Sequence, residues 1–135
     1  MSGASPQLHH AFRERMSGQK DARTRGVAGE TQAAELLAAQ GMEILARNFT
    51  IRGGEIDLIA RDGAYIVFIE VKKRTSAYAG LGREAVNLQK QRRICRAAMQ
   101  YLVKNALTQS YVRFDVVEIQ NETLTHIKNA FSYVQ

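Results

Sequence analysis

Two strand-like segments that meet at Asp62-Gly63 constrain the fold of this chain more than any other feature. "EIDLIAR" precedes the dipeptide and "AYIVFIEVK" follows it. Both segments are rich in the β-branched and aromatic residues that favour strands. Asp-Gly between two such segments is typical of a two-residue hairpin loop. The pattern therefore predicts two antiparallel strands, and it leaves unexplained why Glu70 and Lys72 end an otherwise apolar run.

The predicted hairpin gathers acidic residues on one face of the sheet. If the dipeptide forms the loop, Asp57 stands opposite Phe68, and Glu55 stands opposite Glu70. Side chains alternate along a strand, so Asp57, Glu70 and Lys72 project from the same face. Asp57 and Glu70 are then diagonal neighbours, close enough for both carboxylates to converge on one ion.

The predicted face is partly apolar, which makes the two acids costly. Carboxylates that repel each other and lose hydration need a compensating charge. Mg²⁺ favours one or two carboxylates together with waters and phosphate oxygens. We therefore expect Mg²⁺ or Mn²⁺ at Asp57 and Glu70, with Lys72 orienting a water or stabilising charge on a phosphate. The alternative is a Glu70–Lys72 ion pair on an edge strand, with Asp57 capping a turn. The opposite face carries the candidate core residues Ile56, Leu58, Val67, Ile69 and Val71.

Helical periodicity predicts two helices, over residues 25–40 and 83–105. Glu30 lies on the core-facing stripe of the first, where it either reaches a site or complements the positive helix N-terminus. Lys90 lies on the packing face of the second, where it either extends to solvent or reaches a site. Gly41 suits the position that follows the first helix.

The remaining apolar segments complete the order α-β-β-β-α-β-β. Strands are predicted over residues 42–51, 111–119 and 123–131, in addition to the hairpin. This order predicts an α/β fold, a mixed β-sheet flanked by helices. Residues 1–22 are polar and unpatterned, and we expect a flexible basic tail there. Residues 23–135 are expected to form a single domain.

Composition excludes several classes of protein. No apolar run approaches the roughly 20 residues that span a bilayer, so we expect a cytoplasmic protein without membrane contact. A single cysteine, Cys95, excludes an internal disulfide. Two of the three histidines, His9 and His10, fall in the predicted tail. Together with His126 they make a His/Cys zinc site or a nucleophilic triad a poor explanation.

Positive charge is concentrated in one segment of the chain. Residues 72–96 carry a net charge of +7, whereas the whole chain carries +6. Clustered positive charge is typical of proteins that bind a polyanion. A solvated basic helix face is the alternative, but the cluster begins at the strand that carries Glu70 and Lys72. This position favours nucleic acid as the partner.

The assembled residues resemble the YraN family, whose members are similar to the Holliday-junction-resolvase branch of the PD-(D/E)XK nuclease superfamily. The resemblance covers nearly everything from Gly26 to Ile119. "GGEIDLIA" followed by "VFIEVKKR" at this spacing carries it most strongly. The supporting stretches are "GVAGETQAAELLAAQG", "EAVNLQKQRRI" and "VRFDVVEI". The resemblance implies a restriction-endonuclease-like core, a mixed sheet flanked by helices.

The resemblance also implies roles for individual residues. Asp57 and Glu70 correspond to the metal-binding carboxylates, and the carbonyl of Val71 to a further ligand. Glu30 corresponds to a helix acid that reaches the metal directly or through water. Lys72 corresponds to the catalytic lysine. Ile56 stands where the superfamily motif has proline, a departure that the superfamily tolerates.

These observations lead to two main hypotheses. The first is a Mg²⁺- or Mn²⁺-dependent DNA endonuclease acting on branched or otherwise structured DNA, without a small-molecule cofactor. Lys73, Arg74, Lys90 and Arg93 would contact backbone phosphates, and the resemblance implies a homodimer. The second is a non-catalytic nucleic-acid-binding module on a nuclease fold. A third reading is a domain whose basic surface docks an acidic protein partner.

Overall fold

The computed structural model of the chain describes residues 22–74 and 86–135, with side chains described from residue 28 onward. The elements follow one another in the order α-β-β-β-α-β-β, which confirms the prediction. They are α2 (Ala22–Ala39), β1 (Glu43–Ile51), β2 (Gly54–Asp62), β3 (Tyr65–Arg74), α4 (Leu88–Lys104), β4 (Tyr111–Gln120) and β5 (Thr123–Phe131). The predicted tail, apart from residue 22, and the predicted loop over residues 75–82 lie outside the described residues.

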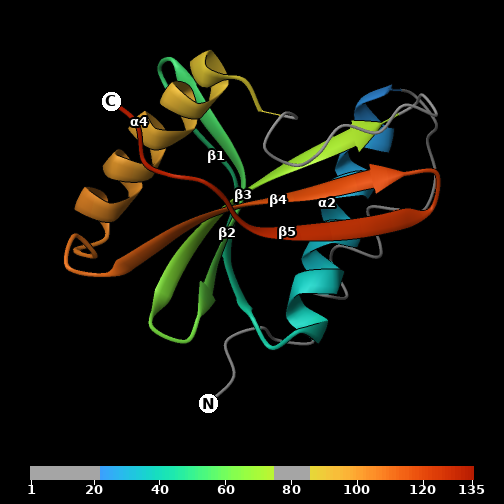
Figure 1. Ribbon diagram of the computed structural model, residues 1–135, viewed down its shortest axis with the longest axis horizontal. Coiled ribbons are helices and arrows are strands. Elements are labelled where there is room, and N and C mark those ends of the chain that lie inside the picture. The colour runs from blue at the N-terminus through green and yellow to red at the C-terminus, as the bar shows by residue number, and fades with distance from the viewer. Residues whose placement is uncertain (1–21, 75–85) are drawn as a thin grey trace.

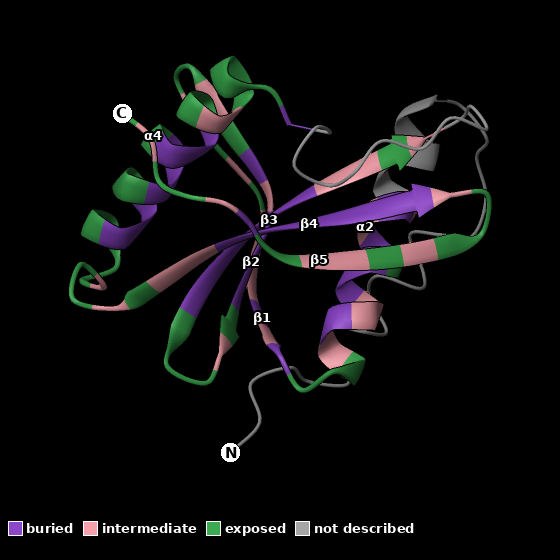
Figure 2. Cartoon of the chain, viewed as in Figure 1, coloured by how far each residue is buried: buried purple, intermediate pink, exposed green. Residues whose placement is uncertain are grey.

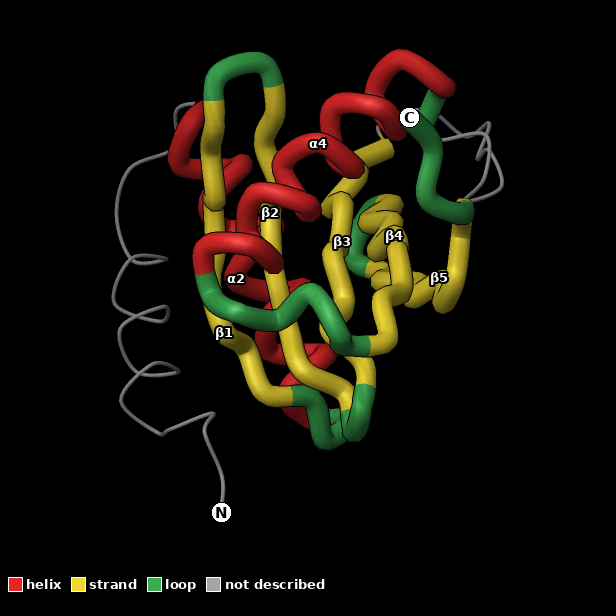
Figure 3. Tube along the Cα trace, turned by 90° about the vertical axis from the view of Figure 1, so that its left-hand side faces the viewer, coloured by secondary structure: helices red, strands yellow, loops and turns green. Residues whose placement is uncertain are grey.

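The strands form one mixed sheet in the order β1-β2-β3-β4-β5. Neighbouring strands are antiparallel except β3 and β4, which are parallel. A parallel pair needs a crossover connection, and α4 lies within it. Helices α2 and α4 cover opposite faces of the sheet (Figures 1 and 3). The predicted fold class is therefore confirmed.

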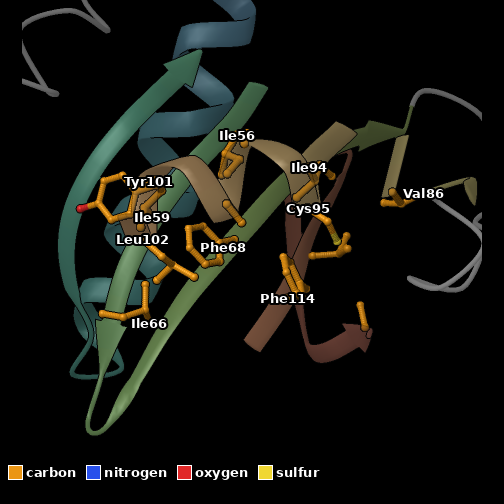
Figure 4. Close-up of a cluster of buried hydrophobic side chains, with 14 residues drawn as sticks. Ile56, Ile59, Ile66, Phe68, Val86, Ile94, Cys95, Tyr101, Leu102 and Phe114 are labelled. Carbon is orange, nitrogen blue, oxygen red and sulfur yellow. The ribbon is translucent and has the colours of Figure 1, made fainter. Parts of the chain in front are cut away.

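Each face of the sheet has its own apolar core. Under α4, the buried cluster includes Phe68, Ile94 and Phe114 (Figure 4). Under α2, it includes Leu37 and Leu58. The central strands β3 and β4 are buried along most of their length, whereas β5 is largely exposed or half-buried (Figure 2). Within the described ranges, neither helix is both long and apolar enough to cross a membrane.

The β2–β3 loop lies one residue later than the sequence predicts. Asp62 pairs with Tyr65, so Gly63 and Ala64 form the turn, with Gly63 at φ +60°. Asp62 stays in the strand, where its Oδ2 accepts a hydrogen bond of 2.9 Å from Nη2 of Arg113. The predicted opposition of Asp57 to Phe68 and of Glu55 to Glu70 is therefore wrong.

The shift moves the register by two residues and so preserves which face most side chains occupy. Ile59 is the true partner of Phe68, and the paired residues end with Leu58 and Ile69. Asp57 and Glu70 are the next residues on their strands. They are thus immediate neighbours rather than diagonal ones.

The helix boundaries differ modestly from the predictions. Helix α2 begins at Ala22 and ends, as predicted, before Gly41, which has φ +94°. The Met42 amide donates to the Leu37 carbonyl and the Gly41 amide to the Ala38 carbonyl, which is a Schellman motif.

Helix α4 begins at Leu88 rather than at residue 83. Asn87 precedes it with extended backbone, and its Oδ1 accepts a 2.9 Å hydrogen bond from the Lys90 amide. Asparagine satisfies an otherwise unpaired amide of the first turn and so fixes the helix start. Residues 83–85 lie outside the described part of the chain.

Candidate active site

Asp57 lies where β2 and β3 stop pairing. The backbone pairs end at Leu58 and Ile69. One step beyond, Oδ2 of Asp57 accepts a hydrogen bond of 2.8 Å from the Val71 amide. A side chain of β2 thus binds the β3 backbone where the strand pairing ends. This bond holds the Asp57 carboxylate against the segment that carries Glu70 and Lys72.

The strands also change face at this level, which the alternating pattern did not predict. Leu58 packs in the α2 core, yet Ile56, only two residues away, packs in the α4 core (Figure 4). The prediction that Ile56 shares the face of Leu58 is therefore wrong. On the neighbouring strand β1, Asn48 has φ +52°, a left-handed conformation that interrupts regular alternation. Asp57 lies at this break.

Glu70 occupies the adjacent position on β3 and is paired with a lysine from α4. Its side chain is 6% exposed, and Oε2 lies 3.1 Å from Nζ of Lys90. The first turn of α4 thus brings Lys90 to the two carboxylates. Of the two alternatives that the sequence left open for Lys90, the structure shows the one in which its side chain reaches Glu70. The Lys90 side chain itself is 48% exposed.

The electrostatics of Asp57 reflect this crowding. Burial, followed by the negative charge of Glu70, raises the pKa of the Asp57 carboxyl to about 8. The Val71 amide and the Lys90 charge act in the opposite direction but do not outweigh them. Burial alone would lower the pKa of the Lys90 ammonium, but Glu70 and then Asp57 raise it. Without a further cation, the site therefore carries more negative charge than its surroundings compensate.

Glu30 approaches the same region from α2. It is half-buried, and its Oε1 lies 3.4 Å from Nη2 of Arg47 on β1. Burial raises the pKa of the Glu30 carboxyl although Arg47 opposes the change. The charge of Glu30 also raises the pKa of Asp57, so the two carboxylates are within electrostatic reach. The structure thus brings Glu30, Asp57 and Glu70 to one end of the sheet.

The predicted basic residues differ in whether a carboxylate of the described residues forms an ion pair with them. Lys72 is half-buried, and within residues 22–74 and 86–135 its ammonium has no hydrogen bond or ion pair. Lys73 and Arg93 are exposed. Arg74, in contrast, has its Nε 3.6 Å from Oε2 of Glu118.

Two further acids lie near the site, and the sequence did not assign either of them a role there. Glu118 is buried beside Lys72, because the parallel register places these residues opposite each other. Glu55 is exposed, and its charge contributes to raising the pKa of both Glu30 and Lys90. Recognising Glu118 requires knowing that β3 pairs with β4, which no local pattern indicates.

The donor set at this end of the sheet fits a hard divalent cation. The described residues contain no group of three or more His, Cys, Asp or Glu side chains arranged to hold a metal. Two carboxylates suffice for Mg²⁺ when a carbonyl, waters and substrate oxygens complete the shell. Asp57 uses Oδ2 for the Val71 amide and Glu70 uses Oε2 for Lys90. Among the described residues nothing binds the other oxygen of either carboxylate, so each has one oxygen for a metal.

Comparison with known proteins identifies the family. The model of the uncharacterised protein family UPF0102 matches residues 29–119, which include the whole candidate site. The chain belongs to the UPF0102 family. A UPF0102 protein from Lachnoclostridium phytofermentans is 50% identical over 107 residues, covering 78% of this chain and 91% of that protein. A UPF0102 protein from Acetivibrio thermocellus is 42% identical over 127 residues, covering 87% and 98%. The resemblance to the YraN family, which is UPF0102, is therefore confirmed.

Proposed function

We propose that this UPF0102 protein is a metal-dependent DNA endonuclease that acts on branched or structured DNA. The observation that carries the proposal is the meeting of Asp57 and Glu70 where β2 and β3 separate, next to Lys72, which has no ion pair with any described residue. A half-buried aspartate whose pKa is raised to about 8 beside a second carboxylate is expensive to maintain for structure alone. Such a pair is typical of a cation-binding catalytic site.

The residues divide the work of phosphodiester hydrolysis among them. Asp57, Glu70 and the Val71 carbonyl would hold Mg²⁺ or Mn²⁺, with Glu30 acting directly or through a water. The bound cation would polarise the scissile phosphate and lower the pKa of the attacking water. The Lys72 ammonium would donate hydrogen bonds to that water or to the phosphate oxygens as negative charge grows on them. The Val71 amide keeps the Asp57 carboxylate oriented throughout.

Exposed basic residues beside the site would hold the DNA backbone. Lys73 and Arg93 are exposed and would contact phosphates in this way, together with Lys90, whose side chain is 48% exposed. Arg74 would first have to leave Glu118. Phosphate contacts of this kind position DNA without reading its sequence. DNA structure, rather than sequence, would therefore determine the substrate.

Cleavage of a labelled DNA panel tests the proposal. Duplex, single strand, flap and four-way junction would be incubated with Mg²⁺ or Mn²⁺ and the wild type, Glu70→Ala or Lys72→Ala. We expect cleavage to fall by about 100-fold or more in both variants, since each loses a group that acts in the transition state. Glu122→Gln, in the exposed β4–β5 turn, is the matched control and should cut like the wild type.

The outcomes separate the two main hypotheses. Metal-dependent cuts that disappear in both site variants support the nuclease. Intact cleavage by Lys72→Ala would refute its catalytic role. Binding of the DNA panel without cuts on any substrate would favour the non-catalytic nucleic-acid-binding module instead.

A further inference from the structure

The Lys90–Glu70 ion pair places a cation of the chain itself on a carboxylate of the proposed metal site. Nζ of Lys90 lies 3.1 Å from Oε2 of Glu70, and the Glu70 side chain is 6% exposed. A carboxylate buried to this degree requires a countercharge. Within the described ranges, Lys90 is the only residue that forms an ion pair with Glu70. Lys90 therefore supplies that countercharge in the metal-free chain.

The two partners differ in how freely they can move. Glu70 lies on β3, where it pairs with Val116 of β4, and its side chain is buried, so its carboxylate has little freedom. Lys90 is fixed only at its backbone, where its amide binds the Asn87 cap. Its side chain is 48% exposed and carries a compact ammonium on a flexible four-carbon stem. Water or another anion can replace Glu70 as its partner at small cost.

We propose that Lys90 occupies Glu70 in the metal-free chain and is displaced to a DNA phosphate when a divalent cation binds. This inference rests on the proposed function. A cation held by Asp57 and Glu70 turns the attraction that holds Lys90 into repulsion. The displaced ammonium stays tethered close to Glu70, and the exposed Arg93 follows one helical turn later on the same side of α4. Lys90 thus opposes metal binding in the absence of DNA. Once the metal has released it, Lys90 adds a contact to DNA, so the metal raises the affinity for DNA more than it would without Lys90. By the same coupling, DNA raises the affinity for the metal.

Metal affinity without DNA gives the first test. Titration calorimetry with Mn²⁺ would compare the wild type with Lys90→Gln and Lys90→Ala. We expect both variants to bind Mn²⁺ about three- to tenfold more tightly, as expected when a partly exposed ion pair no longer competes. Arg92→Ala removes the same charge from α4 at an exposed residue that contacts the Gln135 carbonyl instead, and it should change affinity less than about twofold. Equal or weaker Mn²⁺ binding by Lys90→Gln would overturn the inference.

DNA affinity with and without Mn²⁺ gives the second test. The comparison uses Lys72→Ala and the double variant Lys72→Ala/Lys90→Gln, so that turnover does not consume the DNA. Mn²⁺ should strengthen DNA binding several-fold more in the single variant than in the double one. Equal gains in the two variants would overturn the proposed release of Lys90 to DNA.

The two proposals can fail separately. Mn²⁺ binding that tightens in Lys90→Gln, without cleavage by the wild type, would refute the nuclease and support the role of Lys90. Cleavage by the wild type with unchanged Mn²⁺ affinity in Lys90→Gln would do the reverse.

Discussion

At the scale of single residues, the carboxylate of Asp57 destabilises the folded, metal-free chain. Its carboxyl is half-buried beside Glu70, and these two effects raise its pKa to about 8. An unfolded aspartate has a pKa of about 3.9. Between these values the folded chain binds a proton that the unfolded chain releases. The contribution of Asp57 to the stability of the metal-free protein therefore falls as the pH rises from about 4 to 8.

Replacing Asp57 by asparagine removes this penalty while an amide oxygen can still accept the Val71 hydrogen bond. We expect Asp57→Asn to raise the free energy of unfolding by about 2 kcal/mol at pH 8 without metal, and by progressively less as the pH falls toward 4. Urea unfolding at several pH values in the presence of a chelator measures the difference. Glu122→Gln should show no such pH-dependent gain. An Asp57→Asn protein that is less stable than the wild type at pH 8 would contradict the assignment.

At the scale of elements, helix α4 and strand β2 pack closely at a glycine. A Cβ on Gly54 would lie 2.5 Å from the carbonyl oxygen of Arg93, so the helix backbone fits there only because β2 has no side chain at that point. The contact sets how α4 sits on the sheet and thus where its first turn delivers Lys90. The residues of the β1–β2 turn are Arg52 and Gly53, because Gly54 already pairs with Ile51 and belongs to β2.

We expect Gly54→Ala to lower the free energy of unfolding by about 1–3 kcal/mol, because α4 must move away from the new methyl group. Gly29→Ala is the matched control, since a Cβ there would meet only Cδ1 of Ile119 at 3.4 Å. Within a helix, alanine is favoured over glycine by about 0.5–1 kcal/mol, so Gly29→Ala should be neutral or stabilising. Urea unfolding of both variants gives the comparison. A Gly54→Ala protein as stable as the wild type would show that α4 is not constrained there.

The sequence predicts those parts of the fold and site that depend on one or two neighbouring elements, and it fails where distant elements meet. Alternation along β2 and β3 was enough to place Asp57 and Glu70 on adjacent strands near each other, because any even-length loop preserves their face. The exact loop was not predictable, since Asp62 is kept in the strand by Arg113, far along the chain. The approach of Lys90 to Glu70 was one of two readings of a helical pattern. Glu118 escaped notice because its position depends on the parallel pairing of β3 and β4.

At the scale of the whole molecule, a second polar cluster lies on the α2 face of the sheet, opposite the face toward which Glu70 points. Asp115 is fully buried and accepts hydrogen bonds from Arg113 at 2.9 Å, from Nε2 of His126 at 2.8 Å and from the Asn129 amide at 2.9 Å. Nδ1 of His126 lies 3.0 Å from Oε1 of Gln40, just after α2. The hydrogen bond from Arg113 to Asp62 extends this network to the β2–β3 hairpin. No local pattern predicts it, since its members are brought together only by the tertiary structure.

This network should determine stability without affecting the candidate active site. Burial alone would raise the pKa of the Asp115 carboxyl, but hydrogen bonds from His126, Arg113 and the Asn129 amide, with the Arg113 charge, lower it. Its contribution to stability is therefore present above pH 4 and is lost as the pH falls below that value. We expect Asp115→Asn to lower the free energy of unfolding at pH 7 by about 2–4 kcal/mol, because the buried Arg113 loses a countercharge and His126 loses the carboxylate that binds its Nε2. The loss should shrink below pH 4.

Mn²⁺ affinity provides the contrast, because the side chains of Asp115 and Glu70 point to opposite faces of the sheet. Asp115 pairs with Ile69, the residue before Glu70, but alternation along the strands points Asp115 toward α2 and Glu70 toward α4. Titration calorimetry on folded Asp115→Asn should therefore give the Mn²⁺ affinity of the wild type, while urea unfolding reports the lost stability. An altered Mn²⁺ affinity in a folded protein would mean that the network and the site are coupled through the sheet. Unchanged stability would mean that Asp62 and the backbone hold Arg113 and His126 without Asp115.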